Sequence, residues 1–203
     1  MILLLDNYDS FTWNLHHYLS QLTGEPVVVK RNDEITLSEV AAYTSVVLSP
    51  GPGLPVAAGI MPDLIKQFGA IKPLLGICLG HQAIGEAYGA KLENLKMVLH
   101  GVQREIFVEA PADRLFEGLP QKMLTGHYHS WIVSASEVPK QLTVTAKDAN
   151  GTIMAISHID YPVSGVQFHP ESVMTEHGIK MIKNWLNFCK VFQAQAALPK
   201  NFI

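Results

Sequence analysis

The stretch Leu-Leu-Gly-Ile-Cys-Leu-Gly-His-Gln-Ala-Ile-Gly-Glu-Ala-Tyr, residues 74–88, passes from a short apolar run into a segment with helical spacing. The run 74–77 has no polar side chain, which is typical of a strand covered on both faces of a sheet. Gly89 then ends the helical segment, as glycine commonly does. A buried strand followed directly by a helix is the repeating unit of a layered α/β fold.

The same unit occurs earlier in the chain, and the second half differs from it. In the first half the sequence predicts strands at 2–5, 27–29, 46–49 and 74–77, and helices at 11–22, from 36, at 62–68 and at 79–88. In the second half it predicts strands at 102–108, 123–125, 131–134, 142–147, 152–157 and 163–168, then a helix at 178–192. Alternating strands and helices favour parallel pairing, with functional loops at the carboxyl ends of the strands. We expect one domain over residues 1–192 and a C-terminal tail over 193–203.

Composition excludes several classes of protein. Hydrophobic residues make up 48 % of the 203 residues and charged residues 16 %, which is incompatible with a disordered chain. The net charge of −3 argues against a nucleic-acid-binding protein, which usually carries a basic surface. The two cysteines, Cys78 and Cys189, form no CxxC pair, so neither a disulfide scaffold nor a zinc ribbon is indicated.

The N-terminal apolar run is too short for a secretory signal. It covers residues 1–5 and ends at Asp6, whereas a signal-peptide core needs roughly 7–15 apolar residues. No stretch approaches the roughly 18 apolar residues of a membrane span. We therefore expect a soluble cytoplasmic protein that binds no membrane.

Cys78 is the strongest candidate for a catalytic nucleophile. It lies in a G-x-C-x-G motif between Gly76 and Gly80, where the predicted strand passes into the helix. A sharp turn of this kind projects a nucleophile above the sheet, and glycines relieve the crowding around it. The free N–H groups at the start of the helix favour the thiolate, and the N–H of Leu79 is placed to stabilise an oxyanion. We expect Cys189 to fill the core.

His169 and Glu171 are the candidate base and its orienting group. Pro170 restricts the backbone of His169 to an extended conformation, in which residues i and i+2 point to the same side. One carboxylate is enough to fix the tautomer of a catalytic imidazole. For His127 and His129 we favour structural roles over a metal pair, because no further ligands cluster nearby.

Together with the Pro/Gly loop at residues 49–53, these motifs resemble the class I, triad-type glutamine amidotransferases. The resemblance begins at 6–11 and continues through 49–53, 76–82 and 128–130 to 167–172, so it covers nearly the whole chain. It implies a flavodoxin-like three-layer sandwich, with a central, mostly parallel sheet and added antiparallel strands. It also implies a glutamine-hydrolysing site in which Cys78 attacks, His169 transfers protons and Glu171 orients His169.

The resemblance assigns further residues to the site. The backbone N–H groups of Gly53 and Leu79 would hold the oxyanion. The residues that match glutamine-binding positions of the family are Gly51, Pro52, Gly53, Gln82, Ser130 and Trp131. No metal site or cofactor is implied in this chain, and magnesium is expected in a partner subunit that binds chorismate.

Within the family, the opening block 6–14 resembles the glutaminase component of chorismate-using synthases, and the stretches 77–88 and 99–101 are most similar to component II of anthranilate synthase. The glutaminase of aminodeoxychorismate synthase, in folate synthesis, resembles the chain almost as closely and remains an alternative. Further alternatives are a regulatory subunit without catalytic activity, and a stand-alone thiol peptidase or γ-glutamyl hydrolase. The chain departs from the family pattern at Val102, where many relatives have lysine, and at His127, where the usual residue is arginine.

Overall fold

Five short apolar strands form the parallel centre of the sheet in the computed structural model, which describes residues 1–197. Their order is β2-β1-β3-β4-β9, and each neighbouring pair is parallel. The bounds are Ile2–Asp6 for β1, Val27–Arg31 for β2, Ser45–Leu48 for β3, Leu74–Ile77 for β4 and Val163–Val166 for β9. The predicted parallel α/β centre is confirmed.

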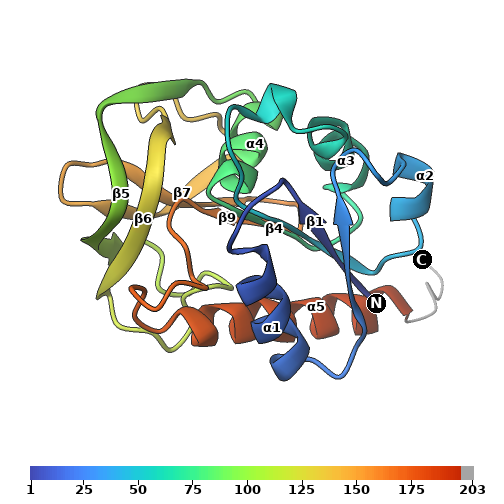
Figure 1. Cartoon of the computed structure of the whole chain (residues 1–203). Coiled ribbons are helices and arrows are strands. Elements are labelled where there is room, and N and C mark those ends of the chain that lie inside the picture. Colours follow the sequence, from blue (N-terminus) through green and yellow to red (C-terminus); the bar gives the residue numbers. More distant parts are fainter. Residues whose placement is uncertain (198–203) are drawn as a thin grey trace.

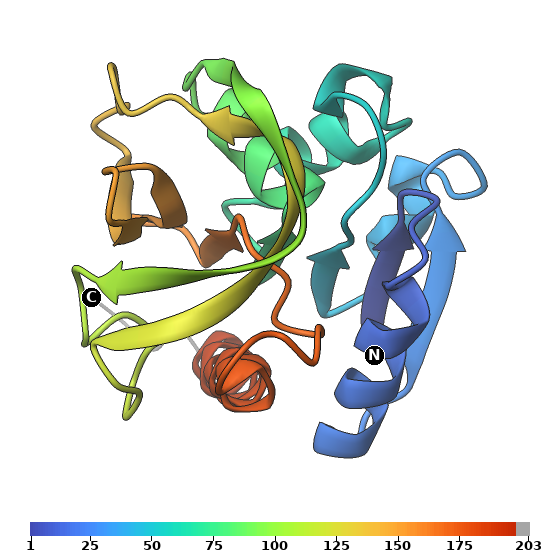
Figure 2. The same cartoon turned by 60° about the vertical axis from the view of Figure 1, so that its left-hand side comes forward.

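Four antiparallel strands extend the sheet beyond β9, giving nine strands in all within residues 1–197. They follow in the order β8 (Ile153–His158), β7 (Leu142–Asp148), β5 (Leu92–Val108) and β6 (Lys122–Val133). Figure 2 shows β5 and β6, in green and yellow, as a long curved ribbon. The expected sandwich of a mostly parallel sheet with added antiparallel strands is therefore confirmed.

Two predictions about this ribbon were wrong. The strand expected at 102–108 begins at Leu92, and the strands expected at 123–125 and 131–134 are one strand, β6. The register between β5 and β6 shifts twice, between the pairs at Asn94 and Leu99 and again between those at His100 and Val102. Such irregularities break the two-residue alternation by which strands are recognised in a sequence.

The helices cover both faces of the parallel strands (Figure 1). On one face lie α1 (Thr12–Leu22) and α5 (Gly178–Ala197), and on the other lie α2 (Leu37–Val40), α3 (Met61–Phe68) and α4 (Leu79–Ala87). A short 3-10 helix, η1, covers Pro55–Ala57. The last helix continues past residue 192, where the tail was expected to begin, and residues 198–203 lie outside the described part. No helix within residues 1–197 is long and apolar enough to cross a membrane.

Alternate side chains of each central strand enter two separate cores. Ile2 and Leu4 of β1 pack in the core beneath α1 and α5, whereas Leu3 and Leu5 pack in the core beneath α3 and α4. This division explains why the strands carry no polar face, as the continuous apolar runs predict. Cys189 is buried in the first core, as expected.

The turn between β4 and α4 is as crowded as the G-x-C-x-G motif predicts. Cys78 has a φ of 51° and a ψ of −99°, a conformation that side-chain-bearing residues rarely adopt. A Cβ atom on Gly76 would lie 2.4 Å from the backbone of Gly80, and one on Gly80 would lie 2.5 Å from the carbonyl oxygen of Leu48. The glycines are therefore required by close backbone approach on both sides of the cysteine.

We expect Gly80→Ala to destabilise the fold, even though alanine is about 1 kcal/mol better than glycine inside a helix. The new methyl group would collide with the backbone of Leu48, and a buried strand can shift only at a cost in free energy. We therefore expect the free energy of unfolding to fall by about 1–3 kcal/mol. Urea unfolding measures this. Gly24→Ala is the control, because a Cβ atom there meets nothing within 4 Å, and equal stabilities of the two variants would contradict the argument.

Candidate active site

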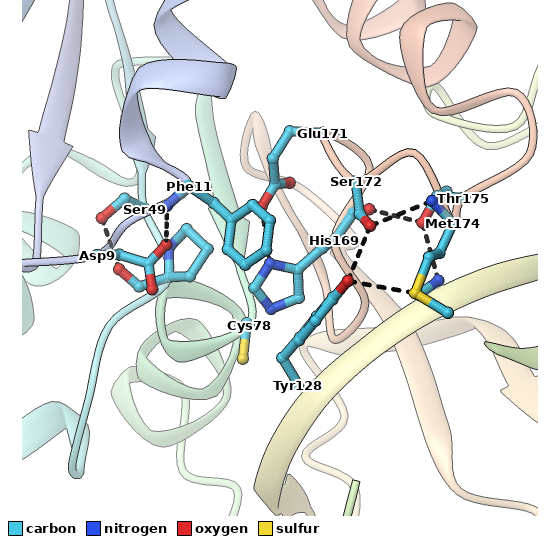
Figure 3. A network of polar contacts seen from close by, with 12 residues as sticks. Asp9, Phe11, Ser49, Cys78, Tyr128, His169, Glu171, Ser172, Met174 and Thr175 are labelled. Atoms are coloured by element: carbon cyan, nitrogen blue, oxygen red, sulfur yellow. Dashed lines mark hydrogen bonds and ion pairs between the residues drawn. The ribbon is translucent and has the colours of Figure 1, made fainter. Parts of the chain in front are cut away.

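Neighbouring strands bring the three candidate catalytic residues together. Cys78 directly follows β4, and the loop that carries His169 and Glu171 follows β9, which pairs with β4 in parallel. The carboxyl ends of the two strands therefore meet at one edge of the sheet. In the view of Figure 3 the imidazole of His169 lies between Glu171 and Cys78.

His169 and Glu171 form a buried ion pair. The Nδ1 atom of His169 lies 2.7 Å from Oε1 of Glu171, and the two residues are 2 % and 1 % exposed. Burial alone would lower the pKa of His169, but the hydrogen bond to Glu171 and the negative charges of Glu171 and Cys78 raise this pKa well above its usual range. The protonated imidazole lines the same cavity as Cys78. The predicted i, i+2 arrangement of His169 and Glu171 is thus present.

Hydrogen bonds hold the backbone of this loop in place. The N–H of His169 donates to the carbonyl of Gly126 (3.1 Å), and the hydroxyl of Thr175 donates to the carbonyl of His169 (2.6 Å). The N–H of Ser172 donates to the same carbonyl, at 3.1 Å. The imidazole is therefore carried on a backbone that is fixed from β6 and from within its own loop.

Two aromatic rings enclose His169, a contact for which the sequence carries no local signal. The rings of Phe11 and Tyr128 lie 5.3 and 4.9 Å from the imidazole, centroid to centroid, and 5.0 Å from each other. Figure 3 shows both rings beside the imidazole. They reach it from the start of α1 and from β6, which are far apart in sequence, so only the folded chain reveals the arrangement.

The predicted glutamine-binding residues line one pocket together with Cys78. This pocket has a volume of about 150 Å3 and includes the sulfur-bearing residue Cys78. Its other lining residues are Gly51, Pro52, Gly53, Gln82, Tyr128, His129, Ser130 and Trp131. All six residues that were assigned by resemblance are therefore brought together, and Tyr128 and His129 join them.

Asn7 fixes the Pro/Gly loop at the rim of this pocket. Its backbone N–H donates to Oγ of Ser49 (2.8 Å) and its side-chain amide donates to the carbonyl of Ser49 (2.9 Å). A Cβ atom on Gly51 would lie 2.6 Å from the carbonyl oxygen of Asn7. Gly53 has a φ of 78°, which glycine adopts readily. The loop is thus shaped by a contact with the segment after β1.

A second, wider cavity also opens onto Cys78. Its volume is about 490 Å3, and it is lined by Tyr8, Asp9, Ser10, Phe11, Pro50, Gly51, Pro52, Cys78, His100, Tyr128 and His169. Burial raises the pKa of Asp9, whose carboxylate accepts the N–H of Phe11 at 2.8 Å. Cys78 thus lies where two cavities of different lining meet.

A row of buried histidines runs along β6 beneath the pocket. Nε2 of His127 lies 2.9 Å from the hydroxyl of Thr125, its Nδ1 lies 3.1 Å from Nε2 of His129, and Nδ1 of His129 lies 3.1 Å from the carbonyl of Trp131. Burial, reinforced by the neighbouring imidazole, lowers the pKa of His127 to about 3. Burial likewise lowers the pKa of His129 to about 4. Both rings are therefore neutral near pH 7.

His81 is buried without a hydrogen-bond partner for either ring nitrogen among the described residues. Burial lowers the pKa of His81, which is 0 % exposed behind the nucleophile, to about 3. Within residues 1–197 no group of three or more His, Cys, Asp or Glu side chains is placed to hold a metal ion.

A strained cysteine facing a buried His–Glu pair defines the class of thiol-dependent amide hydrolases. The model of the class I glutamine amidotransferase family matches residues 3–188, and this chain belongs to that family. It is a glutamine amidotransferase.

Curated relatives cover almost the whole chain. It is 45 % identical to aminodeoxychorismate/anthranilate synthase component 2 of Bacillus subtilis, over 92 % of this chain and 95 % of that one. It is 43 % identical to anthranilate synthase component 2 of Azospirillum brasilense (97 % and 100 % covered) and 42 % identical to aminodeoxychorismate synthase component 2 of Escherichia coli (92 % and 100 %). A solved Thermoplasma acidophilum structure, assigned to one of the subunits of GMP synthase, superposes with a TM-score of 0.87 at 25 % identity, over 97 % of each chain.

We expect the buried neutral histidines to make the protein sensitive to acid. Between about pH 6 and pH 4 the unfolded chain binds a proton at His127 whereas the folded chain does not, so stability falls as the pH falls. In His127→Asn the slope of unfolding free energy against pH should be smaller by about 1.4 kcal/mol per pH unit in this window.

Urea unfolding at several pH values measures this slope. His17→Asn, at an exposed position on α1, is the control and should keep the slope of the unmodified protein. Parallel curves for His127→Asn and the unmodified protein would show that His127 takes up its proton equally in both states.

Proposed function

We propose that this chain is the glutaminase subunit of a chorismate-using synthase, and that it supplies ammonia for anthranilate synthesis. The observation that carries the proposal is the meeting of Cys78, the His169–Glu171 pair and the 150 Å3 pocket at one edge of the sheet. The reaction that would use the ammonia is inferred from the names of the relatives, which are second components of anthranilate and aminodeoxychorismate synthases.

In the proposed reaction, the Cys78 thiolate attacks the side-chain amide carbon of glutamine bound in the pocket. The N–H groups of Gly53 and Leu79 stabilise the negative charge that develops on the amide oxygen. His169 gives its proton to the departing nitrogen, which leaves as ammonia, and a glutamyl thioester forms on the sulfur. His169 then takes a proton from water, which attacks the thioester and releases glutamate and the free thiol.

The local structure favours each of these roles. Leu79 is the first residue of α4, so its N–H is one of the free donors at a helix start and points toward developing negative charge. Gly53 lines the pocket with a positive φ, a conformation that leaves its backbone N–H open to a ligand because no side chain covers it. The carboxylate of Glu171 accepts a hydrogen bond from Nδ1–H of His169. The proton on Nδ1 is therefore held in place, and Nε2 is the nitrogen that transfers protons in the proposed reaction.

The wider cavity is the proposed exit for ammonia. His169, which protonates the leaving nitrogen, lines this cavity together with apolar and aromatic side chains. A partner that covers the cavity would receive ammonia before it reaches bulk water. The acceptor chemistry, with its chorismate and magnesium, belongs to that partner in this proposal.

Both chorismate pathways remain open to this chain, because its relatives include components of each. The Bacillus subtilis relative carries both names. We favour anthranilate synthase on the similarity of the stretches 77–88 and 99–101, with aminodeoxychorismate synthase as the alternative. A non-catalytic role is disfavoured because Cys78, His169 and Glu171 are all present and lie at one edge of the sheet. Incubating the chain with each candidate synthase component and chorismate, and identifying the aromatic product, distinguishes the pathways.

We expect Cys78→Ala to reduce glutamine-dependent synthesis by roughly a thousandfold or more, because the thioester cannot form. Synthesis from added ammonium salt by the assembled complex should be unchanged, since it bypasses this site. Product formation from each nitrogen source is the measurement. Substantial glutamine-dependent synthesis by the variant would refute Cys78 as the nucleophile.

We also expect the synthase component to dock at the edge of the sheet that carries Cys78 and His169. Val173 follows Glu171 closely and is 96 % exposed, which suits a side chain covered by a partner. We expect Val173→Asp to weaken binding of the synthase component by about tenfold or more, because a charge would be buried without a partner.

Titration of the labelled chain with the synthase component measures this affinity. Ile71→Asp is the matched control, because Ile71 is also exposed and lies just before β4, at the opposite edge of the parallel strands. Equal affinities for the two variants would place the docking surface elsewhere.

A further inference from the structure

Gln167 contacts the nucleophile but has no part in the mechanism described above. It follows β9 directly, two residues before His169, and it is 0 % exposed. Its Nε2 atom lies 3.6 Å from Sγ of Cys78, within reach of a hydrogen bond to sulfur. The backbone N–H of Gln167 donates to the carbonyl of Met154 on β8 (2.8 Å), so the residue is held from the neighbouring strand.

The orientation of the Gln167 amide follows from its neighbours. The carbonyl of Trp131 can only accept hydrogen bonds, so the group 2.8 Å away on Gln82 must be its NH2 end. The second hydrogen of that NH2 group is then available to Oε1 of Gln167, at 3.4 Å. With its oxygen turned toward Gln82, Gln167 presents its own NH2 group to the sulfur. A reversed amide would place two donors face to face and an oxygen against a thiolate.

The carbonyl of Trp131, which sets the orientation of the Gln82 amide, is also held by the histidines of β6. Nδ1 of His129 must carry its proton to donate to the Trp131 carbonyl, so the Nε2 atom of the neutral ring accepts from Nδ1–H of His127. Nε2 of His127 then accepts from the hydroxyl of Thr125. The Trp131 carbonyl thus receives one hydrogen bond from the histidine row and one from Gln82, and no member of the network carries a net charge near pH 7.

We propose that Gln167 is a further catalytic residue, whose amide donates a hydrogen bond to the Cys78 thiolate. The proposal rests on the nucleophilic role of Cys78 proposed above. His169 supplies positive charge to the sulfur from the loop, and Gln167 supplies a fixed dipole from the end of β9. In a buried site a donor of this kind stabilises an anion more than it would in water, since no solvent competes for the charge.

The test is the rate at which iodoacetamide alkylates Cys78 in the intact chain. Mass spectrometry of the Cys78 peptide separates this reaction from any at Cys189, which is buried. In Gln167→Met, which keeps a side chain of similar length but no donor, we expect alkylation at pH 7 to slow about tenfold, as for loss of a hydrogen bond to a charged group. The glutaminase kcat should fall by a similar factor.

The pH dependence separates this role from a merely structural one. The alkylation rates of Gln167→Met and the unmodified protein should converge at high pH, where the thiol is ionised in both, whereas a distorted site would remain slow. Gln121→Met makes the same chemical change at an exposed position just before β6 and should leave both rates unchanged. Circular dichroism checks that each variant is folded.

Should Gln167→Met fail to fold, Gln167→Asn serves instead, because its shorter amide keeps the polar character of the site but does not reach the sulfur. Alkylation of a folded Gln167 variant at the rate of the unmodified protein overturns the proposal. Failure of the proposed function looks different: in that case Cys78→Ala keeps its glutaminase activity, whatever the alkylation rates are.

Discussion

The parallel pairing of β4 with β9 is the constraint on which the site depends. The two strands are in register from Leu74 with Val163 to Ile77 with Val166, and the N–H of Cys78 continues the ladder to the carbonyl of Val166 at 2.8 Å. A slip of one residue would turn the side chains that follow β9 to the other face of the sheet. Cys78 and His169 are thus aligned by backbone hydrogen bonds rather than by their own side chains.

Crowding around Cys78 supports the same alignment. The elbow is compressed between β3 and β4, because Gly80 of α4 lies against Leu48 and Gly76 lies against Gly80. This close contact sustains an unfavourable backbone conformation at the cysteine, which the surrounding structure must overdetermine. The apolar strands of the two cores supply that rigidity.

The parallel half of the fold and the position of the candidate catalytic residues at one edge of the sheet were predictable from the sequence, because both depend on local patterns. The run 74–77 and the glycines around Cys78 indicate the elbow, and Pro170 indicates the extended segment that pairs His169 with Glu171. The β5–β6 ribbon was predicted poorly, since its register shifts remove the alternation. The rings of Phe11 and Tyr128 and the amide of Gln167 reach the site only through tertiary contacts, which no local pattern encodes.

The meeting of two cavities at one sulfur atom has a consequence for the order of events in a complex. Beyond the residues that they share, the pocket lined by Gln82 and Trp131 and the cavity lined by Asp9 and His100 have separate walls. A protein seated over the second leaves the first as a separate entrance. In the complex proposed above, glutamine would enter through the pocket and ammonia would leave through the cavity, so the two subunits need not separate between turnovers.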